Sequence, residues 1–306
     1  MPATPSLVEY WLPALPPLPP GHPLRVALCR ADRLAPGAAG YMAGLGEHFA
    51  GVGDELAAGA ITREFLAGDA GEAAWLCADP AWVEPDINGV RMMACGRMGL
   101  DADEAEALAQ TLRPAFAEAG LQLELTTPER WHLRLSAATP LPALAAPERA
   151  LGESLGEHLP GGPEGKFWRV LFTDLQILLH KHPVNQARAA RRLSPVTGIW
   201  MWGGGRLPAP NATSLAGVVS DDTLLRALAA RAGVPWQARG AEAAAAAGAG
   251  WLVDLQDLPF DVFERDWWPQ LAARLATGGI QLHAASGERW RLKPWHRWRF
   301  WRRAGR

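Results

Sequence analysis

The part of the sequence most able to do chemistry runs from residue 180 to residue 208. It combines a histidine, an asparagine and several arginines with three consecutive glycines. Glycine amides and arginine guanidinium groups suit phosphate or carboxylate ligands. The residues that would line such a site are His182, Asn185, Arg188, Gly203, Gly204, Gly205 and Arg206. The string therefore predicts an anion-binding site. The alternative is a tight glycine exit from a buried strand beside a solvated arginine face.

A helix and a strand are predicted to position this string. Residues 167–192 carry the apolar spacing of an amphipathic helix that is broken or kinked at Pro183. Residues 198–202 are apolar and lead into the glycines, as expected for a buried strand. Because open α/β sheets bind ligands beyond the carboxyl ends of their strands, the glycine end of this strand is where an anion would bind.

Strands and helices alternate in the last third of the chain. Strand patterns occur at residues 198–202, 215–219, 251–255 and 280–284, and helix patterns at 221–232 and 262–276. Such alternation predicts an α/β fold with a mostly parallel sheet, helices on both faces and right-handed crossovers. Asp221 and Asp222 lie between a predicted strand and a predicted helix, which is typical of a helix N-cap rather than of a metal pair.

The first half of the chain is less regular. Residues 1–23 are rich in proline and predict an extended arm, and residues 24–66 predict only short helices. Residues 101–119 begin with acidic side chains and predict a helix. Residues 121–125 and 131–135 alternate in hydropathy and predict the two strands of a hairpin.

The string described first resembles a segment of the archaeal-type, cofactor-independent phosphoglycerate mutases, a branch of the alkaline phosphatase superfamily. The shared pattern is His-Pro-Val-Asn, then Arg, then Trp-Gly-x-Gly. Residues 89–108 and 215–225 are similar to two further strand and helix segments of that family. Arg130 and His132 lie in a stretch similar to its Tyr-Arg-His-Leu strand. The resemblance covers about half of the chain and implies that Arg130 and His132 join the ligand-binding residues.

The resemblance also implies a reduced alkaline phosphatase-like core with a smaller inserted α/β lobe. On this basis, residues 1–70 form the N-terminal arm and the helical part of the core. Residues 71–197 form the inserted lobe, which resembles the mutase substrate domain. Residues 198–306 form the rest of the core and a basic, tryptophan-rich C-terminal tail. The matched motif implies that His182, Asn185, Arg188 and Gly203 to Gly205 line one cleft between the lobe and the core.

The metal ligands and the nucleophile of that family have no counterpart in this sequence. The resemblance implies two divalent metals, bound through an Asp-Gly pair after the first strand and an Asp-His pair after the last, and a Ser or Thr nucleophile. Residues 1–70 hold no Asp-Gly pair, and residues 282–287 hold no Asp-His pair. A two-metal site needs roughly six to eight convergent ligands. The eight histidines are scattered, at positions 22, 48, 132, 158, 180, 182, 283 and 296. We therefore expect no catalytic residue, no metal and no cofactor.

Composition excludes several classes of protein. Apolar residues make up 49% of the chain and charged residues 20%, which favours a buried core over global disorder. No apolar run reaches the ~18 to 20 residues of a membrane span, and the N-terminus lacks a basic flank before an apolar stretch, so we expect a cytoplasmic protein. Cys29, Cys77 and Cys95 form no C-x-x-C pair, which argues against structural zinc and against a disulfide framework.

Positive charge is concentrated at the C-terminus. Residues 289–306 hold seven arginines, one lysine and no acid, so the preceding residues must carry about −10 to give the overall −2. This tail interleaves cations with aromatic rings, which suits nucleic acid or an anionic membrane surface. The alternative is a docked tail, with Trp295, Trp298 and Trp301 buried and the arginines pointing outward. Deletion of residues 294–306 would then destabilise the fold.

The shortened form of the family is also similar to a bacterial group identified as E-type regulatory proteins of the Rpf pathogenicity cluster, in which the same strings recur. The first hypothesis is a non-catalytic, phosphoglycerate mutase-like protein that binds a phosphorylated or carboxylated small molecule, or a protein partner, in a regulatory role. The second is an active phosphotransferase or mutase with divergent ligands. The third is a nucleic-acid or membrane-surface adaptor that acts through the tail.

Overall fold

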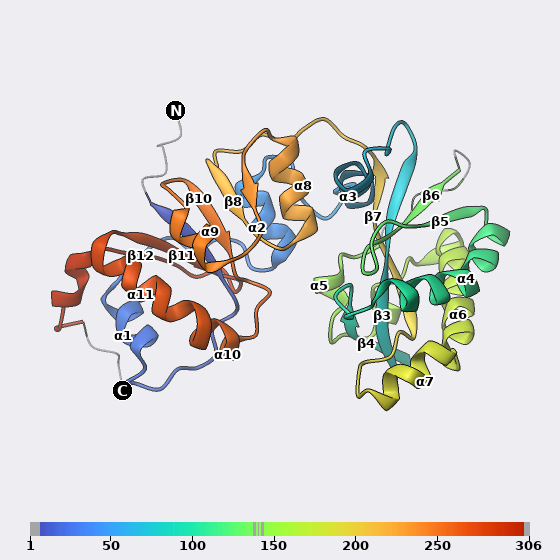
Figure 1. Cartoon of the computed structure of the whole chain (residues 1–306), viewed down its shortest axis with the longest axis horizontal. Coiled ribbons are helices and arrows are strands. Elements are labelled where there is room, and N and C mark those ends of the chain that lie inside the picture. The colour runs from blue at the N-terminus through green and yellow to red at the C-terminus, as the bar shows by residue number, and fades with distance from the viewer. Residues whose placement is uncertain (1–6, 88, 137–138, 140, 142–143, 303–306) are drawn as a thin grey trace. The chain divides into compact units, whose positions relative to one another are not determined.

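The computed structural model describes residues 7–302 apart from residues 88, 137–138, 140 and 142–143. Its contacts divide the chain into two compact units, each with its own sheet (Figure 1). The terminal unit comprises Met1–Gly53 and Pro210–Arg306, and the inserted unit is Asp54–Ala209. The inserted unit contains the lobe predicted over residues 71–197 and extends beyond it at both ends.

The terminal unit is built on a seven-stranded sheet, with the strand order β2, β12, β11, β1, β10, β8 and β9. The strands are β1 (Val8–Leu12), β2 (Asp32–Arg33), β8 (Gly217–Val219), β9 (Trp236–Gln237), β10 (Trp251–Asp254), β11 (Ile280–Ala284) and β12 (Arg289–Leu292). β1 pairs in parallel with β10 and β11, and β8 pairs in parallel with β9 and β10. β12 pairs antiparallel with β11 and with β2. The predicted α/β fold with a mostly parallel sheet is confirmed.

β1 lies in the middle of this sheet, between β10 and β11. The prediction of an extended arm over residues 1–23 is therefore wrong for this segment. Val8 and Tyr10 face one core of the unit, and Trp11 is fully buried on the other face. A strand with a parallel neighbour on each side is buried on both faces, and the prolines that follow Leu12 mark its end rather than prevent it.

Helices cover both faces of the terminal sheet. They are α1 (Pro23–Arg30), α2 (Tyr41–His48), α8 (Thr223–Arg231), α9 (Ala241–Ala246), α10 (Phe260–Val262), the π-helical turn η2 (Phe263–Trp267), α11 (Trp268–Thr277) and the 3-10 helix η3 (Pro294–Trp298). Side chains of α1, α9 and α11 pack with Val8 and Tyr10, whereas α2 packs on the face that carries Trp11. Asp222 accepts a hydrogen bond from the Leu225 amide, so it is the predicted N-cap of α8.

The inserted unit is built on a separate five-stranded antiparallel sheet, with the order β4, β3, β6 and β5 and with β7 also paired to β3. The strands are β3 (Ala74–Asp86), β4 (Gly89–Cys95), β5 (Leu121–Leu125), β6 (Trp131–Leu135) and β7 (Gly198–Arg206). β5 and β6 form the predicted hairpin. The prediction that residues 198–202 begin the remaining core is wrong, because β7 pairs antiparallel with β3 of this sheet. An apolar run that is buried on both faces does not specify which sheet it joins.

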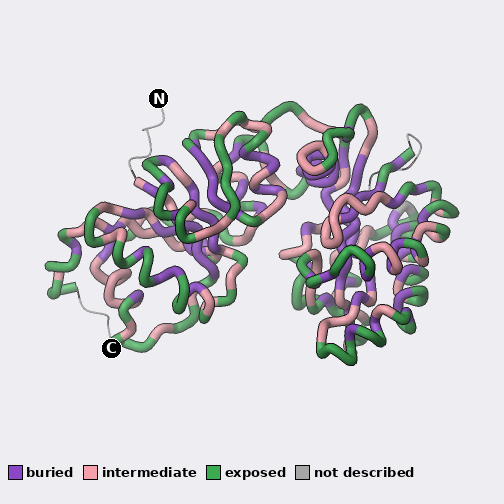
Figure 2. Tube along the Cα trace, viewed as in Figure 1, coloured by how far each residue is buried: buried purple, intermediate pink, exposed green. Residues whose placement is uncertain are grey.

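The helices of the inserted unit surround this sheet. They are α3 (Ala58–Ala67), α4 (Ala102–Glu118), α5 (Pro147–Ala150), the 3-10 helix η1 (Leu155–Glu157), α6 (Gly162–His180) and α7 (Pro183–Ala190). The break predicted at Pro183 within residues 167–192 is confirmed, because proline has no N–H to continue α6 and instead begins α7. Figure 2 shows buried strands and helices with exposed outer sides in each unit. No helix in the described ranges combines the length and the hydropathy of a membrane span.

Candidate functional site

The predicted ligand residues of α7 hold elements of the inserted unit together. His182 caps α7 through Nδ1, which accepts from the Val184 amide at 3.3 Å, and its Nε2 lies 3.0 Å from the Thr111 hydroxyl. Asn185 donates to the Val196 carbonyl at 2.7 Å and accepts from the Val196 amide at 2.8 Å. These bonds fix α7 against α4 and against the segment that precedes β7.

Arg188 is fully buried and uses its guanidinium within the fold. Nη1 donates to the Glu104 carboxylate at 2.6 Å, and Nη2 donates to the Met98 carbonyl at 2.5 Å. Nε donates to the Ser194 carbonyl at 2.9 Å, and Arg191 binds the other oxygen of Glu104 at 2.9 Å. This arrangement is a buried ion pair whose acceptors are supplied by the protein itself.

The glycines allow α3 to lie close against β7. A Cβ atom at Gly203 would come within 2.6 Å of the Ala58 Cβ, and Gly203 has a φ of +62°. A Cβ atom at Gly205 would come within 2.6 Å of the Ala57 Cβ. A larger residue at either position would push the helix away from the strand. The close approach of helix and strand therefore accounts for these glycines without a ligand.

The single cleft predicted for these residues is not formed, because they lie at opposite ends of β7. Asn185 is bonded to Val196, just before the strand, whereas Gly204 lies close to its end. The stretch from Gly198 to Gly204 spans roughly 20 Å in an extended strand. Arg206, the last residue of β7, donates to a main-chain carbonyl before β3 at 2.5 Å. A ligand-binding role for either set of residues stays a prediction.

Arg130 and His132 lie together near the glycine end of β7. Arg130 is 3.1 Å from the buried Asp79 carboxylate and lies over the ring of Trp202, whose Nε1 also donates to Asp79 at 2.7 Å. The ring nitrogens of His132 lie 2.9 and 2.7 Å from two threonine hydroxyls. Burial, reinforced by the charge of Arg130, lowers the pKa of His132 to about 3, so its imidazole is neutral. Their binding role also stays a prediction.

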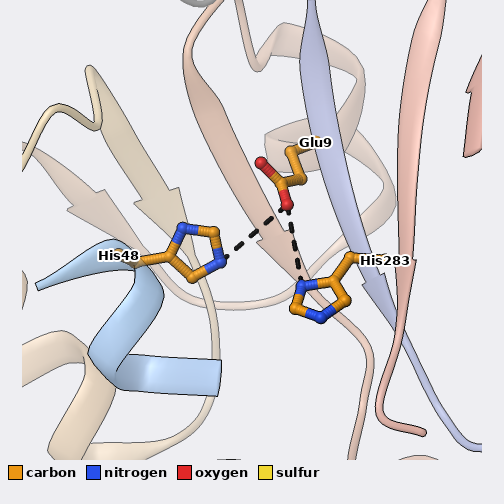
Figure 3. Close-up of side chains that lie close together, drawn as sticks. All are labelled: Glu9, His48 and His283. Atoms are coloured by element: carbon orange, nitrogen blue, oxygen red, sulfur yellow. Dashed lines mark ion pairs between the residues drawn. The ribbon is translucent and has the colours of Figure 1, made fainter. Parts of the chain in front are cut away.

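A group of three donors lies in the terminal unit, on the sheet face that α2 covers (Figure 3). Glu9 comes from β1, His283 from β11 and His48 from the last position of α2. Oε1 of Glu9 lies 3.9 Å from Nε2 of His48 and 3.8 Å from Nδ1 of His283. Among the residues that the structure describes, this Glu-His-His cluster is the one group of three or more His, Cys, Asp or Glu donors close enough to share a metal ion.

The register of β1 and β11 places the cluster on one face. Trp11 pairs with His283 and Glu9 pairs with Gln281, so these alternating side chains all face α2. Trp11 stacks between Tyr41 of α2 and His283, with ring centroids 5.8 and 5.9 Å away. The stacking fixes the plane of the His283 ring.

Burial sets the protonation of the cluster. It lowers the pKa of His48 to about 4. It also lowers the pKa of His283, against the opposing charge of Glu9. Burial raises the pKa of Glu9, while His283 and Arg289 oppose that shift. Both imidazoles are therefore neutral at pH 7, which is the form that binds metals.

No sequence pattern reveals this cluster, because its members are brought together only by the order of the strands and the packing of α2. Glu9 falls in the predicted arm, and His48 and His283 are two of the scattered histidines. A signal is nevertheless present, since His283 lies in a predicted strand and Glu9 interrupts the apolar run of β1. Recognition of β1 as a strand would have placed both residues on strands, but it would not have shown that the two strands are neighbours.

The carboxyl edge of the parallel sheet carries a second polar network. Asp254 is the fully buried last residue of β10 and accepts from the Ser220 hydroxyl at 2.6 Å. Arg239 lies 3.6 Å from the same carboxylate and binds Asp257 at 2.5 Å. Burial, reinforced by Asp257 and opposed by Arg239, raises the pKa of Asp254 to about 7. The resemblance places metal ligands at this edge. Here the Asp254 carboxylate accepts a hydrogen bond from Ser220 and lies beside Arg239 instead.

In the C-terminal tail, the tryptophans are exposed and two arginines point inward, which is the reverse of the predicted docked arrangement. Its outer tryptophans are exposed: Trp295 by 56%, Trp298 by 58% and Trp301 by 73%. Arg299 binds Asp32 at 2.5 Å, and Arg302 donates to the Ala31 carbonyl at 2.7 Å. The prediction of buried tryptophans and outward arginines is wrong here, because polar partners near β2 attract the guanidinium groups inward. Deletion of residues 294–302 would thus remove little apolar burial, and residues 303–306 of the predicted tail lie outside the described part of the chain.

Comparison with known proteins gives a partial match, and no family model matches the chain. A 2,3-bisphosphoglycerate-independent phosphoglycerate mutase from Methanosarcina barkeri is 40% identical over 62 residues. Over this stretch the chain resembles the mutases. The stretch covers 20% of this chain and only 16% of the length of that mutase. The match supports the mutase-like relationship read from the sequence, and the relation to the Rpf group stays a prediction.

Two solved structures align with most of the chain, but the structural similarity is low. A cofactor-independent phosphoglycerate mutase from Thermoplasma acidophilum is 15% identical with a TM-score of 0.35, covering 94% of this chain and 90% of that one. A protein from Pyrococcus horikoshii is 13% identical with a TM-score of 0.45, covering 94% and 87%. At these scores neither structure bears on function, and the fold class rests on the two sheets described above.

Proposed function

We propose that this phosphoglycerate mutase-like chain is a binding protein that does not perform the mutase reaction. Its ligand on this proposal is a phosphorylated or carboxylated small molecule, or a protein partner, and its role is regulatory, as the resemblance to the Rpf group implies. The observation that supports the proposal best is the composition of the carboxyl edge of the parallel sheet.

By the resemblance, an active mutase would hold two divalent metals at this edge. Here β1 ends at Leu12 and continues into prolines, and the Asp254 carboxylate is bonded to Ser220. Within the described part of the chain, the Glu-His-His cluster is the one group of three or more His, Cys, Asp or Glu donors close enough to share an ion, and it lies on the sheet face. Three donors are fewer than the roughly six to eight of a two-metal site.

The first prediction is an absence of turnover. With Mn²⁺ or Zn²⁺ present, the purified full-length chain should form no 2-phosphoglycerate from 3-phosphoglycerate and release no phosphate from p-nitrophenyl phosphate. An active mutase assayed in parallel is the positive control. Calorimetry with 3-phosphoglycerate as the probe should detect binding. Turnover that disappears in Asp254→Asn would contradict the proposal and establish the alternative, an active phosphotransferase or mutase with divergent ligands.

The exposed tail favours a second candidate function, an adaptor for single-stranded nucleic acid. Arg297 lies over the Trp298 ring, 5.1 Å from its centroid, and Lys293 lies over Trp295 at 4.9 Å. Each pair presents a cation and a flat aromatic face at the surface, which suits a phosphate backbone and stacked bases. An anionic membrane surface would use the same groups and is tested as the other arm of the experiment.

The test replaces Trp295, Trp298 and Trp301 together by serine. Because these rings are exposed, the free energy of unfolding should change by less than about 1 kcal/mol. Binding of single-stranded RNA should weaken by about 1 to 3 kcal/mol per stacked ring and fall with added salt. Trp236→Ser is the matched control, since Trp236 also lies under an arginine at the surface. RNA binding that is unchanged in the triple variant, or binding to anionic vesicles alone, would contradict the nucleic-acid adaptor.

A further inference from the structure

We infer that the Glu-His-His cluster, Glu9, His48 and His283, binds one divalent transition-metal ion. The proposed function requires no metal, so this inference goes beyond it and can succeed or fail independently. It also departs from the sequence-based expectation of no metal site.

The donor atoms are nearly at coordination distance from a common centre. Ligand atoms bound to a tetrahedral Zn²⁺ at ~2.0 to 2.1 Å lie about 3.3 Å from one another. The Glu9 oxygen is 3.9 Å from Nε2 of His48 and 3.8 Å from Nδ1 of His283, and all three atoms lie within 4.8 Å of one another. Small side-chain shifts of roughly half an ångström would close the site. Two imidazoles and one carboxylate suit Zn²⁺ and similar ions, whereas Mg²⁺ and Ca²⁺ prefer oxygen ligands.

The two imidazoles carry nitrogens that the protein leaves unsatisfied. Nε2 of His48 and Nδ1 of His283, the atoms that face Glu9, are buried and have no hydrogen-bond partner among the described residues. Buried polar atoms in folded proteins are nearly always paired, because an unpaired one loses its hydration without compensation. Here two unpaired imidazole nitrogens lie near the same Glu9 oxygen. A metal ion bound by all three atoms would satisfy both nitrogens.

A second carboxylate lies on the other side of the His283 ring. Oε2 of Glu47 lies 3.7 Å from Nε2 of His283, on the side of the ring away from Glu9. This distance is too long for a hydrogen bond, so a small shift of Glu47 would be needed to make one. Glu47 is itself held by Arg289 and by the Ala38 amide, which donates at 2.7 Å. Metal-bound histidines commonly direct their other ring nitrogen to a carboxylate, which fixes the tautomer and leaves the first nitrogen for the metal.

The cluster has room for a further ligand. A cavity of about 380 Å³ is lined by Glu9 and His48 together with Glu47, Ser214, Gln281 and Arg289. Three protein donors and an open fourth position are the pattern of sites that bind water or an exogenous ligand at the metal. Arg289 at the wall would favour an anion at that position.

The experiment uses full-length protein stripped with EDTA and titrated with Zn²⁺ against a chromophoric chelator, in buffer without phosphate or carboxylate. Binding should saturate at one Zn²⁺ per chain, and Co²⁺ should give the visible bands of a four- or five-coordinate site with nitrogen ligands. His48→Gln, His283→Gln and Glu9→Gln should each weaken Zn²⁺ binding by at least about 100-fold, and Glu47→Gln by about 10- to 100-fold. His180→Ala is the matched control, because His180 is exposed on the other unit and should leave affinity unchanged.

A measurement on the unaltered chain covers the case in which a variant fails to fold. Addition of Zn²⁺ should shift the NMR signals of the ring nitrogens of His48 and His283 while those of His180 stay in place. Equal Zn²⁺ affinity of the original chain and folded His48→Gln or His283→Gln would overturn the inference, as would unshifted ring signals at saturating Zn²⁺. Because phosphate is absent throughout, either result leaves the anion-binding proposal to its own test.

Discussion

Arg188→Ala should lower the free energy of unfolding of the inserted unit by about 3 to 5 kcal/mol. The substitution leaves the Glu104 carboxylate buried with only the exposed Arg191 beside it, and it removes the donor to the Met98 and Ser194 carbonyls. A buried charge that loses its partner has lost its hydration without any compensating bond. The effect should therefore far exceed that of a typical surface substitution.

Hydrogen exchange measured by mass spectrometry on the full chain checks this result in peptides of α4, α7 and β7. Arg192→Ala is the control, since Arg192 is an exposed arginine in the turn that follows the same helix, and it should change protection little. A folded Arg188→Ala protein with normal protection that has lost binding to 3-phosphoglycerate would refute the structural role and support the ligand-binding role predicted from sequence.

Acidification from pH 7 to pH 5 should cost the inserted unit about 2 kcal/mol through His132 alone. The pKa of His132 is about 3 in the folded chain and about 6.5 when exposed. Below pH 6.5 His132 is protonated in the unfolded state but stays neutral in the folded state. The free energy of unfolding therefore falls by ~1.4 kcal/mol per pH unit until the pH reaches the folded pKa. His132 thus leaves stability unchanged above pH 6.5 and destabilises the folded state increasingly as the pH falls toward 3.

The measurement compares exchange protection in β6 at pH 7 and pH 5, corrected for intrinsic exchange rates. His132→Gln removes the titrating group while an amide can still meet the hydroxyls of Thr62 and Thr126, so its protection should depend less on pH by about 2 kcal/mol. His180→Gln, an exposed change in the same unit, should keep the full dependence. Equal pH dependence in all three proteins would show that His132 is not the responsible group.

Local sequence patterns predicted those elements whose signals are themselves local. The hairpin at residues 121–135 follows from alternation, and the acidic start of α4 and the Asp222 cap follow from helix-end chemistry. The strands at residues 251–255 and 280–284 lie where their apolar runs place them. Each of these depends on a few neighbouring residues and not on which distant segment becomes the partner.

The remaining features depend on pairings that no local pattern encodes. β1 is a short run before many prolines, and only its place between β10 and β11 makes it central. β7 looks like a core strand because it is buried on both faces, yet its partner is β3. The Glu-His-His cluster depends on both the order and the register of β1 and β11. The orientation of the tail depends on Asp32, far away in sequence.

The position of β1 has a consequence for how the chain folds as it leaves the ribosome. Both neighbours of β1 are made only after the whole of Asp54–Ala209 has been synthesised. All strand pairs of the inserted unit lie within that unit, so it can fold before β10 and β11 are made. Until then both edges of β1 are unpaired. Pairing between strands that are far apart in the sequence forms slowly. Until it forms, the unpaired apolar strand β1 is prone to aggregate by pairing with a strand of another chain. Synthesis speed and chaperone protection of the first residues should therefore govern the yield of native protein.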